Sequence, residues 1–290
     1  MGVVRQVRII LEMIKFEHTI FALPFAVMSA FFAAGGWPEP RSLFWILVAM
    51  IGARSAAMAF NRLVDAEFDA ENPRTARRAI PAGLISPRAV ALFTAISSGL
   101  LVVAAWQLNP LALALSPLAL VIVLGYSFTK RFTTLSHLWL GFSLSVAPMG
   151  AWIAIRGRFE PFPFLLVGIV LLWVAGFDII YACQDVEFDR RKGLYSVPAR
   201  LGVGPALALS AAFHAAMYAL LWALPRFARG YGIHLGALYT AGVAVVGVLL
   251  LYEHLIVRPS DLSRVNAAFF TMNGLVSLLL MLVCVADVLW

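Results

Sequence analysis

Apolar residues form nine long runs along the chain, separated by short polar segments. Each run is about 17 to 23 residues long, the length that a helix needs to cross a hydrocarbon layer about 30 Å thick. The alternating apolar and polar residues of a membrane-barrel strand are missing. Because backbone groups in lipid must bond within their own segment, the pattern predicts an all-α polytopic membrane bundle. The predicted spans are 18–36, 42–63, 89–108, 111–128, 136–155, 162–183, 203–223, 232–252 and 266–288.

The composition supports a lipid environment. Of the 290 residues, 62% are hydrophobic and 13% are charged, and the mean hydropathy is +0.90. A soluble domain has far more charge and far less apolar character. The segments between the runs are too short for a soluble domain, so we expect a single transmembrane domain over residues 1–290. No cleavage site with a mature domain behind it follows the first apolar run, which we interpret as a retained helix.

The net charge of +7 does not indicate a nucleic-acid partner, because the basic residues are interleaved with the apolar runs and form no compact patch. The lipid bilayer is the expected partner. A cytoplasmic N-terminus places most basic residues on the cytoplasmic side, as the positive-inside rule requires. The basic loop residues left on the other side are Arg41, Arg156, Arg158, Arg226 and Arg229. We therefore expect a multi-pass protein of the inner (plasma) membrane, with its C-terminus outside.

Two acidic segments stand at the ends of the second and sixth predicted spans. In each segment, four polar residues recur at helical spacing and are expected to share one helix face. In the first they are Arg54, Asn61, Asp65 and Asp69, and in the second they are Asp178, Tyr181, Asp185 and Asp189. The same pattern thus occurs twice, at ends that the predicted topology places on the cytoplasmic side.

The two aspartate pairs indicate a metal site. Carboxylates four residues apart on a helix face lie about 6 Å apart and repel one another unless a cation lies between them. Mg²⁺ prefers oxygen ligands and commonly bridges carboxylates to substrate phosphates. Two such faces opposed across a cavity predict a diphosphate site with Mg²⁺ held by Asp65, Asp69, Asp185 and Asp189. For any one of these residues, an ordinary interfacial role offset by nearby arginines is the alternative.

The combination Asn61-x-x-x-Asp65-x-x-x-Asp69 and Asp185-x-x-x-Asp189 resembles the UbiA superfamily of intramembrane aromatic prenyltransferases. Nine spans with the motif loops on the cytoplasmic side are similar to the architecture of that family. Residues 72–83 and 125–131 resemble two of its loops. Residues 181–200 and 266–273 look like the branch assigned to menaquinone made through futalosine, whereas the better-known branch prenylates 4-hydroxybenzoate.

The resemblance implies a Mg²⁺-dependent transfer of a polyprenyl group from polyprenyl diphosphate to a ring carbon of a hydroxylated aromatic acid. The acceptor would be 4-hydroxybenzoate or 1,4-dihydroxy-6-naphthoate, in ubiquinone or menaquinone biosynthesis. In this interpretation Asn61 assists the four metal carboxylates. The basic residues expected to stabilise the departing diphosphate are Arg74, Arg78, Lys130 and Arg190. Tyr126 and Tyr181 are expected to stabilise the allylic cation, with plain packing as the alternative.

Two charged residues lie deeper in the predicted spans. Arg54 is about two turns below Asn61, where an ionised group is expensive enough to indicate function, so we expect it to pair with the acceptor carboxylate. Asp178 is similarly deep and is expected to position the acceptor phenol or accept a proton. A purely structural pair between Arg54 and Asp178 is the alternative. Lys15 and His18 are further candidates, and no histidine shows metal-ligand spacing.

Two other functions stay open at this point. Intramembrane Arg and Asp can line an ion path, as in a transporter, but here the acids lie mainly at helix ends rather than at the midplane of broken helices. Within the prenyltransferases, a haem or chlorophyll precursor could replace the aromatic acid, and no residue excludes it.

Overall fold

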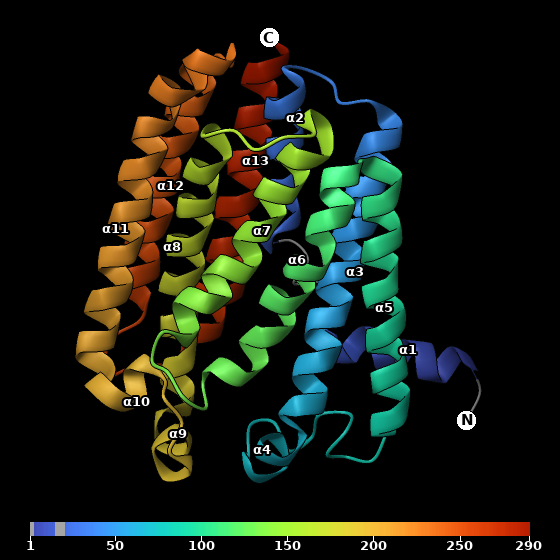
Figure 1. Cartoon of the computed structure of the whole chain (residues 1–290). Coiled ribbons are helices and arrows are strands. Elements are labelled where there is room, and N and C mark those ends of the chain that lie inside the picture. The colour runs from blue at the N-terminus through green and yellow to red at the C-terminus, as the bar shows by residue number, and fades with distance from the viewer. Residues whose placement is uncertain (1–2, 15–20) are drawn as a thin grey trace.

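The computed structural model describes residues 3–14 and 21–290. Helices form most of this part of the chain, and the long ones run side by side as a bundle (Figure 1). They are α1 (Val3–Met13), α2 (Leu23–Ala34), α3 (Pro40–Val64), α4 (Ala66–Glu71), α5 (Pro87–Leu108), α6 (Pro110–Thr129), α7 (Ser136–Arg156), α8 (Phe162–Ala182), α9 (Val186–Lys192), α10 (Val197–Leu201), α11 (Val203–Ala228), α12 (Ala237–Ile256) and α13 (Asn273–Leu289). The prediction of an all-α membrane fold is therefore confirmed.

The number of spans differs from the prediction. Within the described residues, eight helices are long and apolar enough to cross a membrane. The first predicted span, 18–36, contains the shorter helix α2, which has 12 residues, and residues 18–20 lie outside the described part. Eight of the nine predicted spans are thus matched by a helix of sufficient length.

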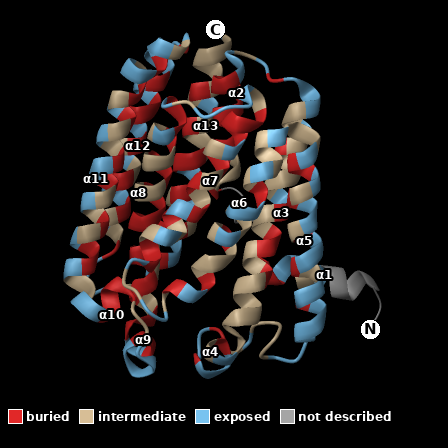
Figure 2. Cartoon of the chain, viewed as in Figure 1, coloured by how far each residue is buried: buried red, intermediate tan, exposed pale blue. Residues whose placement is uncertain are grey.

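The outer faces of the helices are apolar, as a lipid environment requires. Figure 2 shows that buried residues concentrate on the inner helix faces and exposed residues on the outer ones. Large apolar side chains remain exposed there, among them Leu92 on α5, Val121 on α6 and Leu251 on α12. Because water would not tolerate so much exposed apolar surface, lipid is the solvent that fits these faces.

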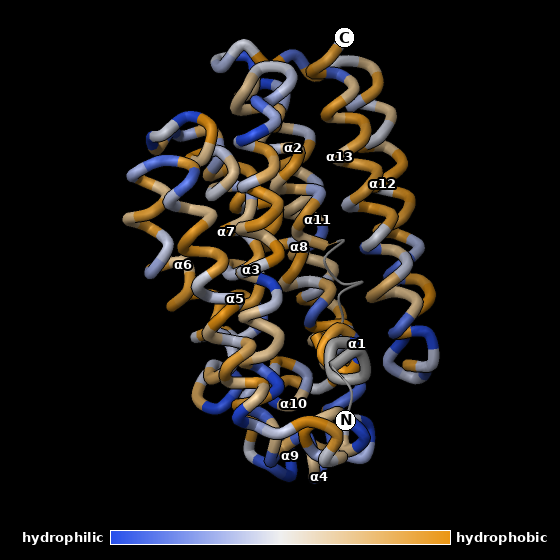
Figure 3. The backbone as a smooth tube through the Cα atoms, turned by 90° about the vertical axis from the view of Figure 1, so that its right-hand side faces the viewer, coloured by the Kyte–Doolittle hydropathy of each residue, from blue (hydrophilic) through white to orange (hydrophobic). Residues whose placement is uncertain are grey.

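Helix α8 lies at the centre of the packing, against α7 on one side and α11 on another. Its side chains Leu166, Val170 and Trp173 are fully buried. Polar residues gather instead at the end of the bundle formed by α4, α9 and α10 (Figure 3). Helix α13 ends at the opposite end (Figure 1). The fold therefore separates an apolar middle from one strongly polar end, where both acidic segments lie.

A π-helix, Ala267–Met272, precedes α13. The wider turns of a π-helix leave backbone groups without their usual partners, and such turns are frequent at functional sites. Here the Asn273 side-chain amide donates to the carbonyl oxygens of Ala268 and Phe269 and also to the buried carboxylate of Glu253. The Phe269 ring packs on that of Tyr181, with centroids 4.2 Å apart. The π-helix thus supports the second acidic segment from the side of α13.

Candidate active site

Two connected cavities lie at the polar end and centre of the bundle. The larger has a volume of about 610 Å³ and is lined mainly by apolar residues of α3, α6, α7 and α8. The smaller, of about 110 Å³, is lined by charged residues that include all four motif aspartates. Asp65, Asp185 and Lys130 line both. A charged chamber thus adjoins an apolar chamber large enough for a small-molecule ligand.

Each motif aspartate pair is placed by a break in its helix. Helix α3 ends at Val64, and α8 continues through a short 3₁₀ turn, Cys183–Asp185. Asp65 and Asp185 occupy almost the same backbone conformation, with φ/ψ of −92°/7° and −106°/8°. This sparsely populated region is one where active-site residues are often found. Each helix therefore restarts after its first aspartate, a break that the helical spacing of the sequence did not predict.

The break does not scatter the carboxylates. The backbone N–H of Asp65 still donates to Asn61, and that of Asp69 to Asp65. Asp69 and Asp189 both stand in the first turn of the short helices α4 and α9. All four carboxylates therefore line the small cavity from two sides, as the internal repeat predicts.

Each of the four aspartates forms an ion pair with a different basic side chain. The pairs are Asp65 with Arg131 (3.1 Å), Asp69 with Arg78 (2.6 Å), Asp185 with Arg74 (2.5 Å) and Asp189 with Lys130 (2.8 Å). Three of these cations, Arg74, Arg78 and Lys130, are among the residues that the sequence predicts for diphosphate binding. Arg131 was missed, although it adjoins Lys130 in a loop singled out by the resemblance.

These pairs control the charge of the chamber. Burial raises the pKa of the Asp65 carboxyl, and the hydrogen bond from Arg131 opposes that rise. Burial also acts to lower the pKa of Arg74, but its hydrogen bonds to Asp185 prevail and raise the pKa above its ordinary value. Arg74 therefore stays charged. The carboxylate form of Asp65 depends on the cations around it.

The chamber also suits a hard divalent cation. Its donors are carboxylate oxygens, which Mg²⁺ prefers. Oδ1 of Asp189 is buried and has no hydrogen-bond partner in the described part of the chain, so an oxygen ligand remains unused. Within residues 3–14 and 21–290, no three acidic, histidine or cysteine side chains already converge as a metal cluster. The ion pairs explain this, because each carboxylate is turned toward its own cation.

Two amides take part in the chamber. Asn61 donates to Oδ2 of Asp65 at 2.9 Å and lines the large cavity; its assisting role toward a metal stays a prediction. Asn72 donates to Oδ1 of Asp185 at 3.1 Å and was not singled out from the sequence. The signal was available, because Asn72 begins the loop that resembles the family. Its side chain also accepts a hydrogen bond from the backbone N–H of Arg74 and so positions that arginine.

The structure corrects the expectation for Arg190. Its Nε donates to the carbonyl oxygen of Ala199 at 2.9 Å. Arg190 lines neither of the two cavities. Arg190 stands in the last turn of α9, connects this helix to α10 and does not line the charged chamber. Lys15 and His18 lie outside the residues that the structure describes.

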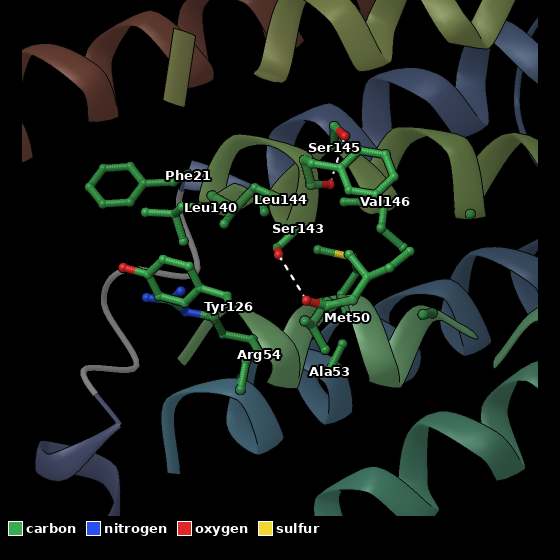
Figure 4. A pocket seen from close by; sticks show the side chains of 18 of the residues that line it. Phe21, Met50, Ala53, Arg54, Tyr126, Leu140, Ser143, Leu144, Ser145 and Val146 are labelled. Atoms are coloured by element: carbon green, nitrogen blue, oxygen red, sulfur yellow. Dashed lines mark hydrogen bonds between the residues drawn. The ribbon is translucent and has the colours of Figure 1, made fainter. Parts of the chain in front are cut away.

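The deeper candidates line the large cavity as expected. Arg54 and Tyr126 project into it in the same direction (Figure 4). Nε of Arg54 is buried and, within the described residues, has no hydrogen-bond partner. Tyr181 accepts a hydrogen bond from Arg74 at 3.1 Å, and the guanidinium also lies 5.4 Å from the centre of the Tyr181 ring. Tyr181 thus joins the charged chamber to the apolar one.

The structural pair between Arg54 and Asp178 does not form. Oδ2 of Asp178 lies 2.7 Å from Nδ1 of His137 instead. His137 was passed over in the sequence because its spacing fits no metal site. A polar residue at the start of an otherwise apolar span was the signal that could have drawn attention to it.

Comparison with known proteins identifies the family. The sequence model of the UbiA prenyltransferase family matches residues 22–275. The 4-hydroxybenzoate octaprenyltransferase of Vibrio cholerae serotype O1 is 32% identical over 244 residues, which cover 83% of this chain and 83% of the relative. The enzyme of the same name from Nitrosospira multiformis is 32% identical over 246 residues, covering 83% of this chain and 81% of the relative.

Solved structures show the same fold. The apo structure of a UbiA homologue from Aeropyrum pernix K1 has a TM-score of 0.83 and 37% sequence identity, covering 94% of this chain and 98% of that one. A UbiA homologue from Archaeoglobus fulgidus, bound to DMAPP and Mg²⁺, has a TM-score of 0.75 and 19% identity, covering 96% and 98%. The chain therefore belongs to the UbiA prenyltransferase family and is a membrane-embedded, alkyl-transferring enzyme.

Proposed function

We propose that this enzyme transfers a polyprenyl group from polyprenyl diphosphate to a ring carbon of a hydroxylated aromatic acid, 4-hydroxybenzoate or 1,4-dihydroxy-6-naphthoate. The observation that carries the proposal is the buried Nε of Arg54, which has no hydrogen-bond partner among the described residues and belongs to a cavity that Asp178 also lines. A buried guanidinium without a carboxylate needs an anionic ligand. Both acceptors supply a carboxylate and a hydroxyl group. The names of the relatives also favour an aromatic acid over a haem or chlorophyll precursor.

The donor diphosphate would bind in the charged chamber. Asp65, Asp69, Asp185 and Asp189 would hold Mg²⁺, with Asn61 assisting. The bound metal would stabilise the negative charge that develops on the diphosphate. Arg74, Arg78, Lys130 and Arg131 are then free to leave the carboxylates and bind the diphosphate oxygens. Guanidinium groups suit this exchange, because they bind carboxylate and phosphate with the same two-pronged geometry.

Transfer begins when the allylic C–O bond breaks and the diphosphate leaves with the electron pair. The basic side chains of the chamber stabilise the departing oxygen. Positive charge then develops on C1 of the prenyl group, and the ring faces of Tyr126 and Tyr181 stabilise it. Tyr181 is suitably placed, because it lies against Arg74 of the charged chamber and also lines the apolar cavity. The surrounding apolar wall keeps water away from the cation.

The acceptor completes the reaction. Arg54 binds its carboxylate, and Asp178 binds its hydroxyl group, which increases the electron density of the ring. A ring carbon forms a bond to C1 of the prenyl group and then loses its proton, for which Asp178 is the nearby base. The products are the prenylated acid, diphosphate and one proton. The apolar cavity holds the prenyl chain throughout.

The polar end of the bundle would face the cytoplasm in an inner (plasma) membrane, with the N-terminus on the same side. The basic loops around the acidic motifs agree with the positive-inside rule. The exposed apolar faces of α5, α6 and α12 would contact the bilayer. Residues 1–290 would act as one transmembrane domain.

The test is a product assay on the purified protein in lipid. It would combine Mg²⁺, a polyprenyl diphosphate and each of the two acceptors, with mass spectrometry of the product. A chelator and the methyl esters of both acceptors serve as controls, since the first removes the metal and the second removes the charge that Arg54 would bind. We expect a prenylated acid that requires Mg²⁺. The absence of product from both acceptors contradicts the proposal.

A further inference from the structure

His137 connects three elements of the site, although the reaction outlined above does not use it. It lies in the first turn of α7 and is 3% exposed. Its Nδ1 lies 2.7 Å from Oδ2 of Asp178 on α8. Its Nε2 accepts a hydrogen bond of 3.2 Å from the backbone N–H of Val197, at the start of α10. Both ring nitrogens are thus used, each by a different element.

These contacts determine where the imidazole carries its proton. A backbone N–H only donates, so Nε2 of His137 must be the unprotonated nitrogen. The proton of the neutral ring is then on Nδ1, which donates to the Asp178 carboxylate. The hydrogen bond from Val197 to Nε2 therefore fixes the tautomer of His137. In other sites too, the partner of one ring nitrogen determines which nitrogen carries the proton. The imidazole is a donor to Asp178 and cannot take a proton from it through Nδ1.

The backbone of α10 that sets this tautomer is itself tied to the charged chamber. Ser196 occupies the N-cap position of α10, where a serine usually accepts a hydrogen bond from its own helix. Its hydroxyl makes no such bond here and donates to Oδ2 of Asp189 at 2.6 Å. The backbone N–H of Tyr195 donates to the carbonyl oxygen of Lys130. The segment before α10 therefore links a motif carboxylate and its lysine to the nitrogen that His137 uses as acceptor.

The spacing between His137 and Asp178 is fixed by the helices that carry them. One turn after His137, α7 approaches α8 so closely that a Cβ on Gly141 would lie 2.3 Å from the carbonyl oxygen of Leu171. Small residues allow such close contact between membrane helices. Oδ1 of Asp178 has no hydrogen bond within the part of the chain that the structure describes, where only Oδ2 has a partner. One carboxylate oxygen is therefore held by His137, and the other remains for a ligand in the large cavity.

We propose that His137 is a positioning residue for the acceptor: as the Nδ1–H tautomer set by Val197, it holds one oxygen of Asp178 so that the other receives the acceptor hydroxyl. The hydrogen bond to a carboxylate in a site of low polarity is strong and directional. It keeps the Asp178 carboxylate at a fixed angle to the diphosphate chamber, because α10 is anchored on Asp189. This inference rests on the proposed function of Asp178.

Two substitutions of His137 test the contacts of its two ring nitrogens one at a time. The side-chain amide of asparagine reaches about as far as Nδ1, and that of glutamine about as far as Nε2. His137→Asn retains a donor to Asp178 and loses the acceptor for Val197. His137→Gln retains the acceptor for Val197 and loses the donor to Asp178. Each variant thus loses one of the two contacts, and both carry a side-chain amide of the same polarity.

We expect His137→Gln to raise the acceptor KM about tenfold and to lower kcat, whereas the donor KM changes little. The acceptor KM of His137→Asn should stay within about threefold of wild type. His234→Gln is the matched control, because His234 is exposed and lies in the loop before α12. Equal acceptor KM values for His137→Asn and His137→Gln would mean that the histidine only fills space, and would overturn the proposal.

A double-mutant cycle tests whether His137 acts through Asp178. Asp178→Asn removes the carboxylate that His137 is proposed to orient, so His137→Gln should cost little more in that background. Fully additive losses in kcat/KM for the acceptor would contradict an action through Asp178. Size-exclusion profiles and thermal unfolding of each variant in lipid show whether it is folded.

The tautomer has a readout that needs no turnover. In protein labelled with ¹⁵N-histidine, the ¹⁵N chemical shifts of His137 should show a protonated Nδ1 and an unprotonated Nε2, assigned by their loss in His137→Gln. A protonated Nε2 would overturn the inference. If the wild-type protein prenylates neither acceptor, the proposed function fails instead, and the two failures are thereby distinguished.

Discussion

The guanidinium of Arg74 donates two hydrogen bonds to the carboxylate of Asp185, a residue 111 positions away in the chain. The bonds are 2.9 and 2.5 Å long and join the loop after the first acidic motif to the second motif. Arg74 also contacts the Tyr181 hydroxyl group at 3.1 Å. One side chain thus connects the loop after the first motif to the second motif and to Tyr181, which lines the apolar cavity. A diphosphate that replaces the carboxylate of Asp185 would receive the same two donors.

Arg74→Lys should weaken donor binding. Lysine retains the charge but cannot form two parallel hydrogen bonds to one ligand. We expect the KM for polyprenyl diphosphate to rise about tenfold, which corresponds to about 1.4 kcal/mol, with a smaller change in the acceptor KM. Arg77→Lys is the matched control, because Arg77 is exposed in the same loop. An unchanged donor KM in Arg74→Lys would contradict a role in diphosphate binding.

Asp185→Asn should abolish turnover while the bundle stays folded. The amide retains the size of the carboxylate and part of its hydrogen bonding, but it removes the charge that Mg²⁺ and Arg74 require. The measurement is product formation over a Mg²⁺ titration, together with size-exclusion chromatography in lipid. Glu187→Gln removes the same charge from an exposed residue of the same segment and should be close to wild type. Normal activity of Asp185→Asn would refute the metal assignment.

Much of this site follows from local periodicity. The helical spacing of polar residues identified both aspartate pairs and also the deeper Arg54 and Asp178, because a repeat of three or four residues is a property of one helix. The helix breaks at Asp65 and Asp185 do not change the spacing of the polar residues, so the sequence pattern does not reveal them. The backbone angles of these two residues do.

Contacts between segments that are distant in the sequence could not be predicted from helical spacing. The partner of Arg74 depends on how the loop after α4 packs against the end of α8, and the partner of His137 depends on where α10 begins. Arg190 shows the same limit, because a basic residue beside a motif aspartate points toward Ala199 once α9 and α10 are packed. Charge and position along a helix predict membership of a site, whereas tertiary packing decides which group each side chain binds.

Arg54→Ala should impair acceptor binding and leave the donor KM nearly unchanged. The guanidinium lines the large cavity and its Nε has no described protein partner, so an acceptor carboxylate would be its main ligand. We expect the acceptor KM to rise by tenfold or more, as for the loss of about 1.5 to 3 kcal/mol from a charge-assisted hydrogen bond. The measurement is the ratio of kcat/KM for an aromatic acid to that for its methyl ester.

The ratio of kcat/KM for the acid to that for the ester also shows which result would contradict the role of Arg54. Wild type should prefer the acid strongly, and Arg54→Ala should lose that preference, because the ester lacks the charge that Arg54 binds. If Arg54→Ala still prefers the acid as strongly as wild type does, the carboxylate binds elsewhere. Arg156→Ala is a suitable control, since Arg156 ends α7, at the far end from the acidic motifs.

Asn273→Leu should destabilise the protein and also alter donor binding. Leucine has the same branched skeleton as asparagine, although it is larger, and it cannot donate to Glu253, Ala268 and Phe269. Glu253 is fully buried, and its second oxygen already has no hydrogen-bond partner in the described residues. Removing a partner from such a group costs about 1 to 3 kcal/mol, so the free energy of unfolding should fall by that amount. Unfolding in mixed micelles measures it.

A second effect of Asn273→Leu shows whether the π-helix shapes the donor site or only stabilises the fold. Without the Asn273 amide, the π-helix is free to relax to an α-helix, which would rotate Phe269 away from the ring of Tyr181. The donor KM should then rise in Asn273→Leu even at a temperature where the protein is fully folded. Asn266→Leu, at an exposed position just before the π-helix, should change neither quantity. A loss of stability with an unchanged donor KM would show that the π-helix supports the fold without shaping the donor site.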